Sequence, residues 1–354
     1  MPVVPRDLAR TLDRIAARYA RKPAVTDLHV EVVQPRTGFR WSWGVPDRPY
    51  FIASITKLFT TAVLMQLRRE GVLDLDAPAS SILGKDVLAG LVVHDGVDHG
   101  DRVTVRQLLT QTSGLPDYFD QAGSGGTSVA EEIYTTDRTW TFDELLDRAR
   151  GVPSPYPPGT EGPAHYSDTN YALLGRVIES LTGETVPASV RRRVLDPLEL
   201  EHTWHLTPQN RDRYDEVAPV RRKDRPIRIP DAIASFPADG GIVSTTHDQV
   251  RFLQAFVGGD LFPASYLAEM TGTWRRITPS FGPLRYGLGV MQFHLPRWQA
   301  PPRGTPPMIG HSGSFGTVTY HAPDTDVYVA AAVNQIQPQR LPYPLLARIA
   351  LLVR

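Results

Sequence analysis

The chain has no cysteine among its 354 residues. That absence excludes a thiol nucleophile, a thiolate metal site and any disulfide bond. Lysine is also scarce, because only four of the 38 basic residues are lysines and 34 are arginines. Arginine keeps its proton at physiological pH, whereas a desolvated lysine can lose it. Each lysine is therefore worth examining as a titratable group.

Net charge and long apolar runs are missing as well. The 38 basic residues balance 38 acidic ones, so we expect neither a nucleic acid nor an anionic membrane as partner. No apolar run approaches the length of a membrane span, and the N-terminal segment lacks the apolar core of a signal peptide. We expect a cytoplasmic protein if Met1 is the native start, although a secreted chain trimmed of its leader would look the same. No pattern in the sequence indicates an oligomeric state.

Hydrophobic periodicity predicts helices and strands in separate parts of the chain. Helices are predicted at residues 6–20, 54–70, 169–182, 246–258 and 340–352. Strands are predicted at residues 28–33, 39–45, 242–244, 286–293, 308–312, 317–321 and 327–333. Because the strands lie near both ends, we expect an α/β (α+β) protein with one sheet built from the two terminal segments.

The middle of the chain is predicted to be helical and rich in loops, because many prolines and glycines interrupt its regular patterns. We therefore predict two subdomains. Residues 1–70 and 235–354 would form the sheet subdomain, and residues 71–234 would form an all-helical insert.

The first candidate motif is Ser54-Ile55-Thr56-Lys57, at a predicted helix start. Residues three apart on a helix share one face, so the two functional side chains would lie together. A serine hydroxyl is a poor nucleophile until a base takes its proton, and a lysine amine can be that base if its pKa falls. Burial and the positive end of the helix dipole would both lower it. A helix N-cap serine followed by a solvated lysine would give the same four letters.

Two further motifs follow along the chain. Tyr166 and Asp168 precede a predicted helix, where a phenol close to a lysine ammonium could relay protons to a leaving group. Asp168 could equally be the N-cap of that helix. Further on, His311, Ser312 and Gly313 lie at the end of a predicted strand, where a glycine lets a substrate approach the backbone. Each motif alone also has an ordinary structural explanation.

The order Ser-x-x-Lys, Tyr-x-Asx, His-x-Gly on two terminal α/β segments around a helical insert resembles the serine β-lactamase and penicillin-binding-protein superfamily. The resemblance is to its class C-type branch, which includes D-Ala-D-Ala carboxypeptidases, family VIII esterases, D-aminopeptidases and related acyltransferases. Supporting stretches at residues 108–115, 158–160, 166–171, 240–245 and 286–289 extend the resemblance over most of the chain.

The resemblance implies a β-lactamase/transpeptidase-like fold, with a central antiparallel sheet flanked by helices and the active site between the subdomains. Ser54 would form an acyl-enzyme, with Lys57 and Tyr166 as its acid–base partners. The backbone N–H groups of Ser54 and Ser314 would form the oxyanion hole. Asp168, with residues 311–313 (His311, Ser312 and Gly313), would contact the substrate, without a metal or cofactor.

Three positions depart from the family's usual pattern. The second motif usually ends in asparagine, and Asp168 has no side-chain amide to donate. The third motif has His311 where a lysine would hold a substrate carboxylate. Gln111 replaces a common histidine. The neutral His311, with the absence of a leader segment, favours an intracellular esterase, amidase or transacylase over a cell-wall carboxypeptidase.

The function predicted from these residues is a serine hydrolase that acts on a small-molecule ester or amide through a Ser54 acyl-enzyme. One alternative is a biosynthetic acyltransferase that uses the same Ser-Lys-Tyr site and a small acyl donor. A second alternative is a catalytically silent homologue that binds a ligand.

Overall fold

A sheet of nine strands forms the centre of the molecule. The computed structural model describes residues 6–123, 126–278, 282–300, 303–338 and 340–353. From edge to edge the strands are β2 (Phe39–Trp43), β1 (His29–Gln34), β16 (Val327–Ala332), β15 (Thr317–Ala322), β14 (Met308–Gly313), β13 (Met291–Phe293), β12 (Leu284–Tyr286), β11 (Arg275–Thr278) and β6 (Ala164–His165). Neighbours pair antiparallel, except that β11 and β6 pair in parallel. The predicted sheet built from both ends of the chain is thus confirmed.

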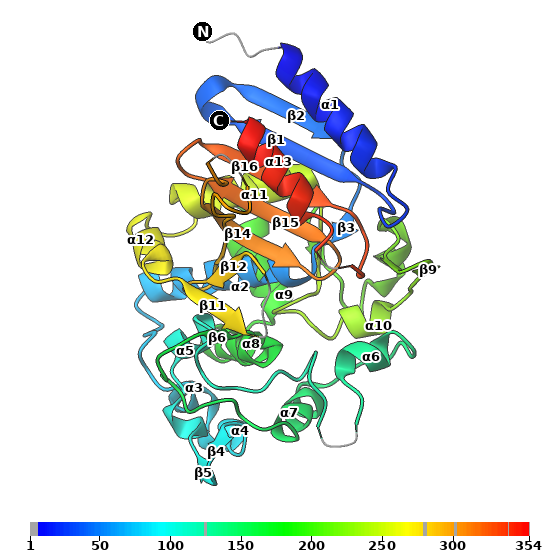
Figure 1. The fold of residues 1–354 in the computed structure, drawn as a ribbon. Coiled ribbons are helices and arrows are strands. Elements are labelled where there is room, and N and C mark those ends of the chain that lie inside the picture. The colour runs from blue at the N-terminus through cyan, green and yellow to red at the C-terminus, as the bar shows by residue number, and fades with distance from the viewer. Residues whose placement is uncertain (1–5, 124–125, 279–281, 301–302, 339, 354) are drawn as a thin grey trace.

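Helices cover both faces of this sheet (Figure 1). Every residue of β1, β15 and β16 is buried, as expected for strands packed on two sides. Helix α11 (Thr246–Gly258) packs on one face, where Val250 and Leu253 meet Val33. Helices α1 (Arg6–Ala20) and α13 (Tyr343–Leu352) contact each other and lie on the other face. The two ends of the chain therefore close one layered core.

The strand predicted over residues 286–293 is instead two strands, β12 and β13, joined by a turn. Gly289 in this turn has a φ of 71°, a conformation that glycine adopts without strain. A Cβ at this position would lie 2.5 Å from the Thr61 side chain of α2 (Thr56–Arg69). The turn therefore lets the sheet approach the helix that follows Ser54.

Helices are the main regular structure in residues 71–234, but the expectation of an all-helical insert needs correction. Two hairpins occur there, β4 (Val93–His94) with β5 (Val97–Asp98) and β8 (Arg221–Arg222) with β9 (Arg225–Pro226). Strand β7 (Trp204–His205) also joins β10 (Ile242–Ser244), which pairs with β3 (Tyr50–Phe51). Apart from β10, each of these strands has only two residues, which is too short for hydrophobic periodicity to predict. The division at residues 70 and 235 remains a prediction.

The helices of this region complete the fold. They are α3 (Ser80–Leu83), α4 (Lys85–Leu88), α5 (Val105–Leu109), α6 (Val129–Ile133), α7 (Phe142–Arg150), α8 (Asp168–Thr182), α9 (Val186–Val190) and α10 (Pro230–Ile233), and α12 (Ser265–Thr271) follows later in the chain. Helix α8 packs against α2, which brings the second motif to the first. Within the described ranges, none of the helices has the length and apolar character that crossing a membrane requires. Residues 1–5, the first part of the segment that was searched for a signal peptide, lie outside the described residues.

Candidate active site

Ser54 lies in a short 3-10 turn, Ala53–Ile55, at the start of α2. Two strands hold the chain just before it. The Ile52 N–H donates to the Ile242 carbonyl of β10 (3.0 Å), and the Thr317 hydroxyl of β15 donates to the Ile52 carbonyl (2.9 Å). Ala53 has a φ of 49°, a left-handed conformation that few non-glycine residues adopt and that often occurs at functional sites. The turn places Ser54 on the wall of a pocket.

Gly313 of the third motif packs against this same turn. A Cβ at Gly313 would lie 2.3 Å from the Ile52 carbonyl oxygen and 2.2 Å from the Thr317 hydroxyl oxygen. Only glycine therefore allows β14 to lie against the chain that precedes Ser54. The sequence analysis suggested that Gly313 lets a substrate approach the strand backbone, and this role remains a prediction.

Lys57 is fully buried below Ser54. Its Nζ lies 3.2 Å from Ser54 Oγ, 2.5 Å from Asp168 Oδ1 and 3.1 Å from the Asp239 carbonyl oxygen. These oxygen atoms can all accept hydrogen bonds from a lysine ammonium. The site is therefore arranged around a charged Lys57.

The pKa of Lys57 follows from the same contacts. Burial lowers this pKa, but the negative charge of Asp168, with that of Asp239, raises it by more, so the pKa lies above its ordinary value. The expectation of a lowered pKa was wrong, because Asp168 supplies a carboxylate where the family pattern has an amide. The contacts of Lys57 therefore favour its protonated form.

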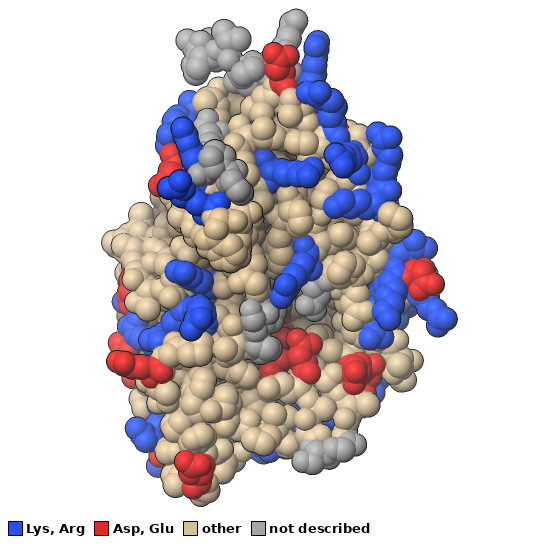
Figure 2. Space-filling model, viewed as in Figure 1, with Lys and Arg blue, Asp and Glu red and all other residues tan. Residues whose placement is uncertain are grey.

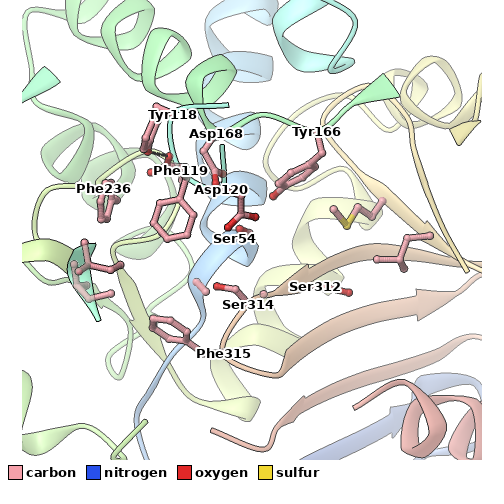
Figure 3. Close-up of a pocket in the computed structure, with 18 of the residues that line it drawn as sticks. Ser54, Tyr118, Phe119, Asp120, Tyr166, Asp168, Phe236, Ser312, Ser314 and Phe315 are labelled. Carbon is pink, nitrogen blue, oxygen red and sulfur yellow. Dashed lines mark hydrogen bonds between the residues drawn. The ribbon is translucent and has the colours of Figure 1, made fainter. Parts of the chain in front are cut away.

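Tyr166 is the third member of this group. Its hydroxyl hydrogen-bonds with both Ser54 and Lys57, and its ring centroid lies 5.3 Å from Lys57 Nζ. Burial raises the pKa of Tyr166 further than the charge of Lys57 lowers it, so the hydroxyl is a neutral phenol. Figure 3 shows Tyr166 and Ser54 extending into the same pocket. The structure thus brings together Ser54, Lys57 and Tyr166 from two distant parts of the chain.

Asp168 is the first residue of α8 rather than its N-cap, which is Ser167. The loop after α5 holds this helix end in place. The Asp168 N–H donates to Asp117 Oδ1 (2.9 Å), and the Ser167 N–H donates to Gln111 Oε1 (2.9 Å). Asn170 Nδ2 also donates to Gln111 Oε1 (2.6 Å). Gln111, noted above as a departure, therefore orients the loop that carries Tyr166 and Asp168.

The remaining predicted site residues fall into two groups. Ser312, Gly313 and Ser314 line the pocket with Ser54 (Figure 3). His311 does not line the pocket. The residue is buried, and the centroid of its ring lies 6.3 Å from that of Tyr166. Burial and the charge of Lys57 lower the pKa of His311 to about 3, so the imidazole is neutral. The structure therefore places His311 behind Tyr166 rather than on the pocket surface.

Aromatic side chains form much of the rest of the pocket lining. Its aromatic members are Tyr118, Phe119, Tyr134, Phe236, Phe315 and Tyr343. Across the described ranges, no group of three or more His, Cys, Asp or Glu side chains could hold a metal ion. A nucleophile, a proton-carrying phenol and an ammonium beside an apolar pocket can together support acyl transfer from a small molecule.

Comparison with known proteins decides the family. The sequence pattern of the family described as "Beta-lactamase" matches residues 29–353. The chain belongs to the beta-lactamase family. The superfamily resemblance and the fold predicted from the three motifs are confirmed by this match and by the similar solved structures.

Other members of the beta-lactamase fold are similar over nearly the whole chain. A D-stereospecific amidohydrolase from Streptomyces sp. is 28% identical with a TM-score of 0.72, covering 92% of this chain and 94% of that one. EstCE1, described as a hydrolase with promiscuous acyltransferase activity, is 18% identical with a TM-score of 0.75 and 98% coverage of both chains. The second likeness concerns the fold alone.

Curated relatives are similar over shorter stretches. Protein flp of Staphylococcus aureus (strain N315) is 28% identical over 182 residues, which is 51% of this chain and 33% of that protein. An N-acetylmuramyl-L-alanine amidase of Bacillus subtilis (strain 168) is 26% identical over 312 residues, 80% of this chain and 67% of that protein. The chain thus spans about a third of the length of the first of these relatives.

Sequence reasoning missed two aspartates of this beta-lactamase-like site. Asp239 accepts a hydrogen bond from Lys57 through its backbone and from the Tyr118 hydroxyl through Oδ2 (2.5 Å). Burial raises the pKa of Asp239 to about 7, although the charge of Lys57 lowers it. Asp120 lines the pocket near Asp168. Both lie just outside the family-like stretches at 108–115 and 240–245, so extending those stretches would have found them.

Proposed function

We propose that this protein is a serine hydrolase that cleaves a small-molecule amide or ester through a Ser54 acyl-enzyme. The observation that carries the proposal is the joint contact of Ser54 with Lys57 Nζ (3.2 Å) and with the Tyr166 hydroxyl, on the wall of a pocket that a small molecule could enter. The similarity to a D-stereospecific amidohydrolase supports an amide as substrate.

The charges of the site indicate how the proton moves. Ser54 Oγ bonds to the substrate carbonyl carbon while its proton passes to the Tyr166 oxygen, and the Tyr166 proton passes to the leaving nitrogen or oxygen. The bond to the leaving group then breaks. The Lys57 ammonium stabilises negative charge on both oxygens during these transfers. The N–H groups of Ser54 and Ser314 would hold the carbonyl oxygen. Water completes the cycle by the reverse transfers.

A fluorophosphonate probe with intact-mass detection tests the nucleophile. We expect one adduct on the wild-type protein and none on Ser54→Ala, which should remain folded because Ser54 is a small residue on the pocket wall. A folded wild-type protein without an adduct would exclude the hydrolase and leave the ligand-binding alternative. An adduct that persists in Ser54→Ala would place the nucleophile elsewhere.

The choice between hydrolysis and acyl transfer needs a second measurement. We expect water to be the main acceptor when p-nitrophenyl esters or p-nitroanilides are turned over in the presence of added amines or alcohols. Product analysis by mass spectrometry separates the free acid from the new amide or ester. A dominant transfer product would favour the transacylase.

A further inference from the structure

Asp120 has a carboxylate on the pocket wall. The residue is exposed and lies in the loop between α5 and α6, on the pocket wall near Ser54 (Figure 3). Its backbone N–H donates to Asp117 Oδ2 (2.9 Å), but no hydrogen bond or ion pair within the described ranges involves its own carboxylate. A carboxylate so placed is available to a ligand.

The rest of the pocket makes the charge of Asp120 significant. Three aspartates line the pocket, Asp120, Asp168 and Asp239, whereas none of its described lining residues is an arginine or a lysine. The chain has 34 arginines, and on the face seen in Figure 2 basic side chains lie mostly above the acidic ones at its middle. Arg222 comes near, packing on the ring of Tyr134 (4.6 Å), but it is not a lining residue.

The charge count of the site supports the same conclusion. The ion pair of Asp168 with Lys57 at 2.5 Å balances one negative charge with the one positive charge. Asp120 forms no ion pair within the described ranges; the charge of Asp168 repels its carboxylate, and the charge of Lys57 attracts it less strongly. An ammonium group would neutralise Asp120, and the aromatic ring of Phe119, which also lines the pocket, would favour a cation further.

We propose that the pocket selects substrates with a protonated amino group close to the scissile amide or ester, and that Asp120 binds this group. The inference rests on the proposed hydrolase and names its substrate class. Asp120 is thus a specificity-determining residue. A substrate with a carboxylate at the same place is disfavoured, because two negative charges would face each other in a partly desolvated pocket.

Protection of Ser54 from the fluorophosphonate probe tests the inference without knowing the substrate. Benzylammonium and benzyl alcohol have nearly the same shape and differ in charge, and the aromatic wall suits both. Near neutral pH we expect benzylammonium to protect the wild-type protein at about tenfold lower concentration than benzyl alcohol, the size typical of a charged hydrogen bond. In Asp120→Asn the two should protect equally.

Asp101→Asn provides the matched control, because Asp101 is exposed in the 3-10 turn Gly100–Arg102 and does not line the pocket. It should retain the wild-type preference. Equal protection by the two compounds in wild type, no protection by either, or a preference that survives in Asp120→Asn would each overturn the inference. A folded protein without any labelling would instead overturn the proposed hydrolase, so the two failures are distinguishable.

Discussion

Asp168 changes the chemistry of the lysine beside it. Its carboxylate lies 2.5 Å from the fully buried Lys57 Nζ, at the position where the family's second motif usually ends in asparagine. Burial alone would lower the pKa of Lys57, and the charge of Asp168 reverses the direction of this shift. In the proposed mechanism, a protonated Lys57 leaves Tyr166 to accept the Ser54 proton.

The substitution Asp168→Asn should return Lys57 to the form that burial favours. We expect the pKa of Lys57 to fall below that of an ordinary lysine, so that Lys57 loses its proton at a lower pH than an exposed lysine does. The remaining three lysines, Lys22, Lys85 and Lys223, are exposed and can be replaced by arginine. In that background NMR of side-chain-labelled lysine observes Lys57 alone.

The wild-type residue provides the comparison for this titration. Lys57 in the lysine-depleted chain should stay protonated to a pH above the ordinary lysine range, because its pKa is raised. Asp101→Asn removes an exposed carboxylate and should titrate as wild type. A wild-type Lys57 that loses its proton near neutral pH would show that Asp168 does not hold the ammonium.

At the scale of elements, the position of Ser54 depends on strands that are distant in sequence. The turn Ala53–Ile55 is held by β10 and β15 and lies against Gly313 of β14. Gly313→Ala would place a methyl group 2.3 Å from the Ile52 carbonyl oxygen. We expect a loss of about 1–3 kcal/mol in the free energy of unfolding, since the site cannot enlarge without moving backbone.

The same variant should slow labelling of Ser54 more than it lowers stability. A shift of the turn by about 1 Å would misplace the hydroxyl and cost up to about 100-fold in rate. Gly258→Ala is the control, because a Cβ there would meet only Asp260 Oδ2 at 4.0 Å near the end of α11. Urea unfolding and labelling rates measure both effects. Unchanged labelling in a destabilised Gly313→Ala protein would contradict the role given to this contact.

The elements that sequence predicts well are those with a long, regular pattern. Helix α1 begins and ends where periodicity places it, and β15 and β16 extend as their apolar runs indicate. The turn at Gly289 was missed because its reason, close contact with Thr61, is not local in sequence. Ser54, Lys57 and Tyr166 were found through motif order. Asp120 and Asp239 were missed because their role comes from position in the pocket, which no short motif records.

For the whole molecule, a net charge of zero conceals an uneven distribution. Arginines pair with acidic residues away from the pocket, as Arg106 does with Asp76 and with Glu269 (2.6 Å each) and Arg193 with Glu70 (2.7 Å). The pocket keeps three aspartates without a lining arginine or lysine in the described ranges. From the net charge we expected neither a nucleic acid nor an anionic membrane as partner. Composition alone could not reveal the local negative charge of the pocket.

The local charge predicts opposite salt dependences for ligands of opposite charge. Raising salt from about 0.01 M to about 1 M shortens the Debye length from roughly 30 Å to roughly 3 Å. Screening should weaken protection of Ser54 by benzylammonium several-fold, because the attraction to Asp120 falls. Benzoate should protect poorly at low salt and better at high salt, because the same screening removes repulsion. Benzyl alcohol is the uncharged control and should change little. If benzoate protects best at low salt, the net charge that acts on a ligand in the pocket is positive, and Lys57 rather than the aspartates governs binding.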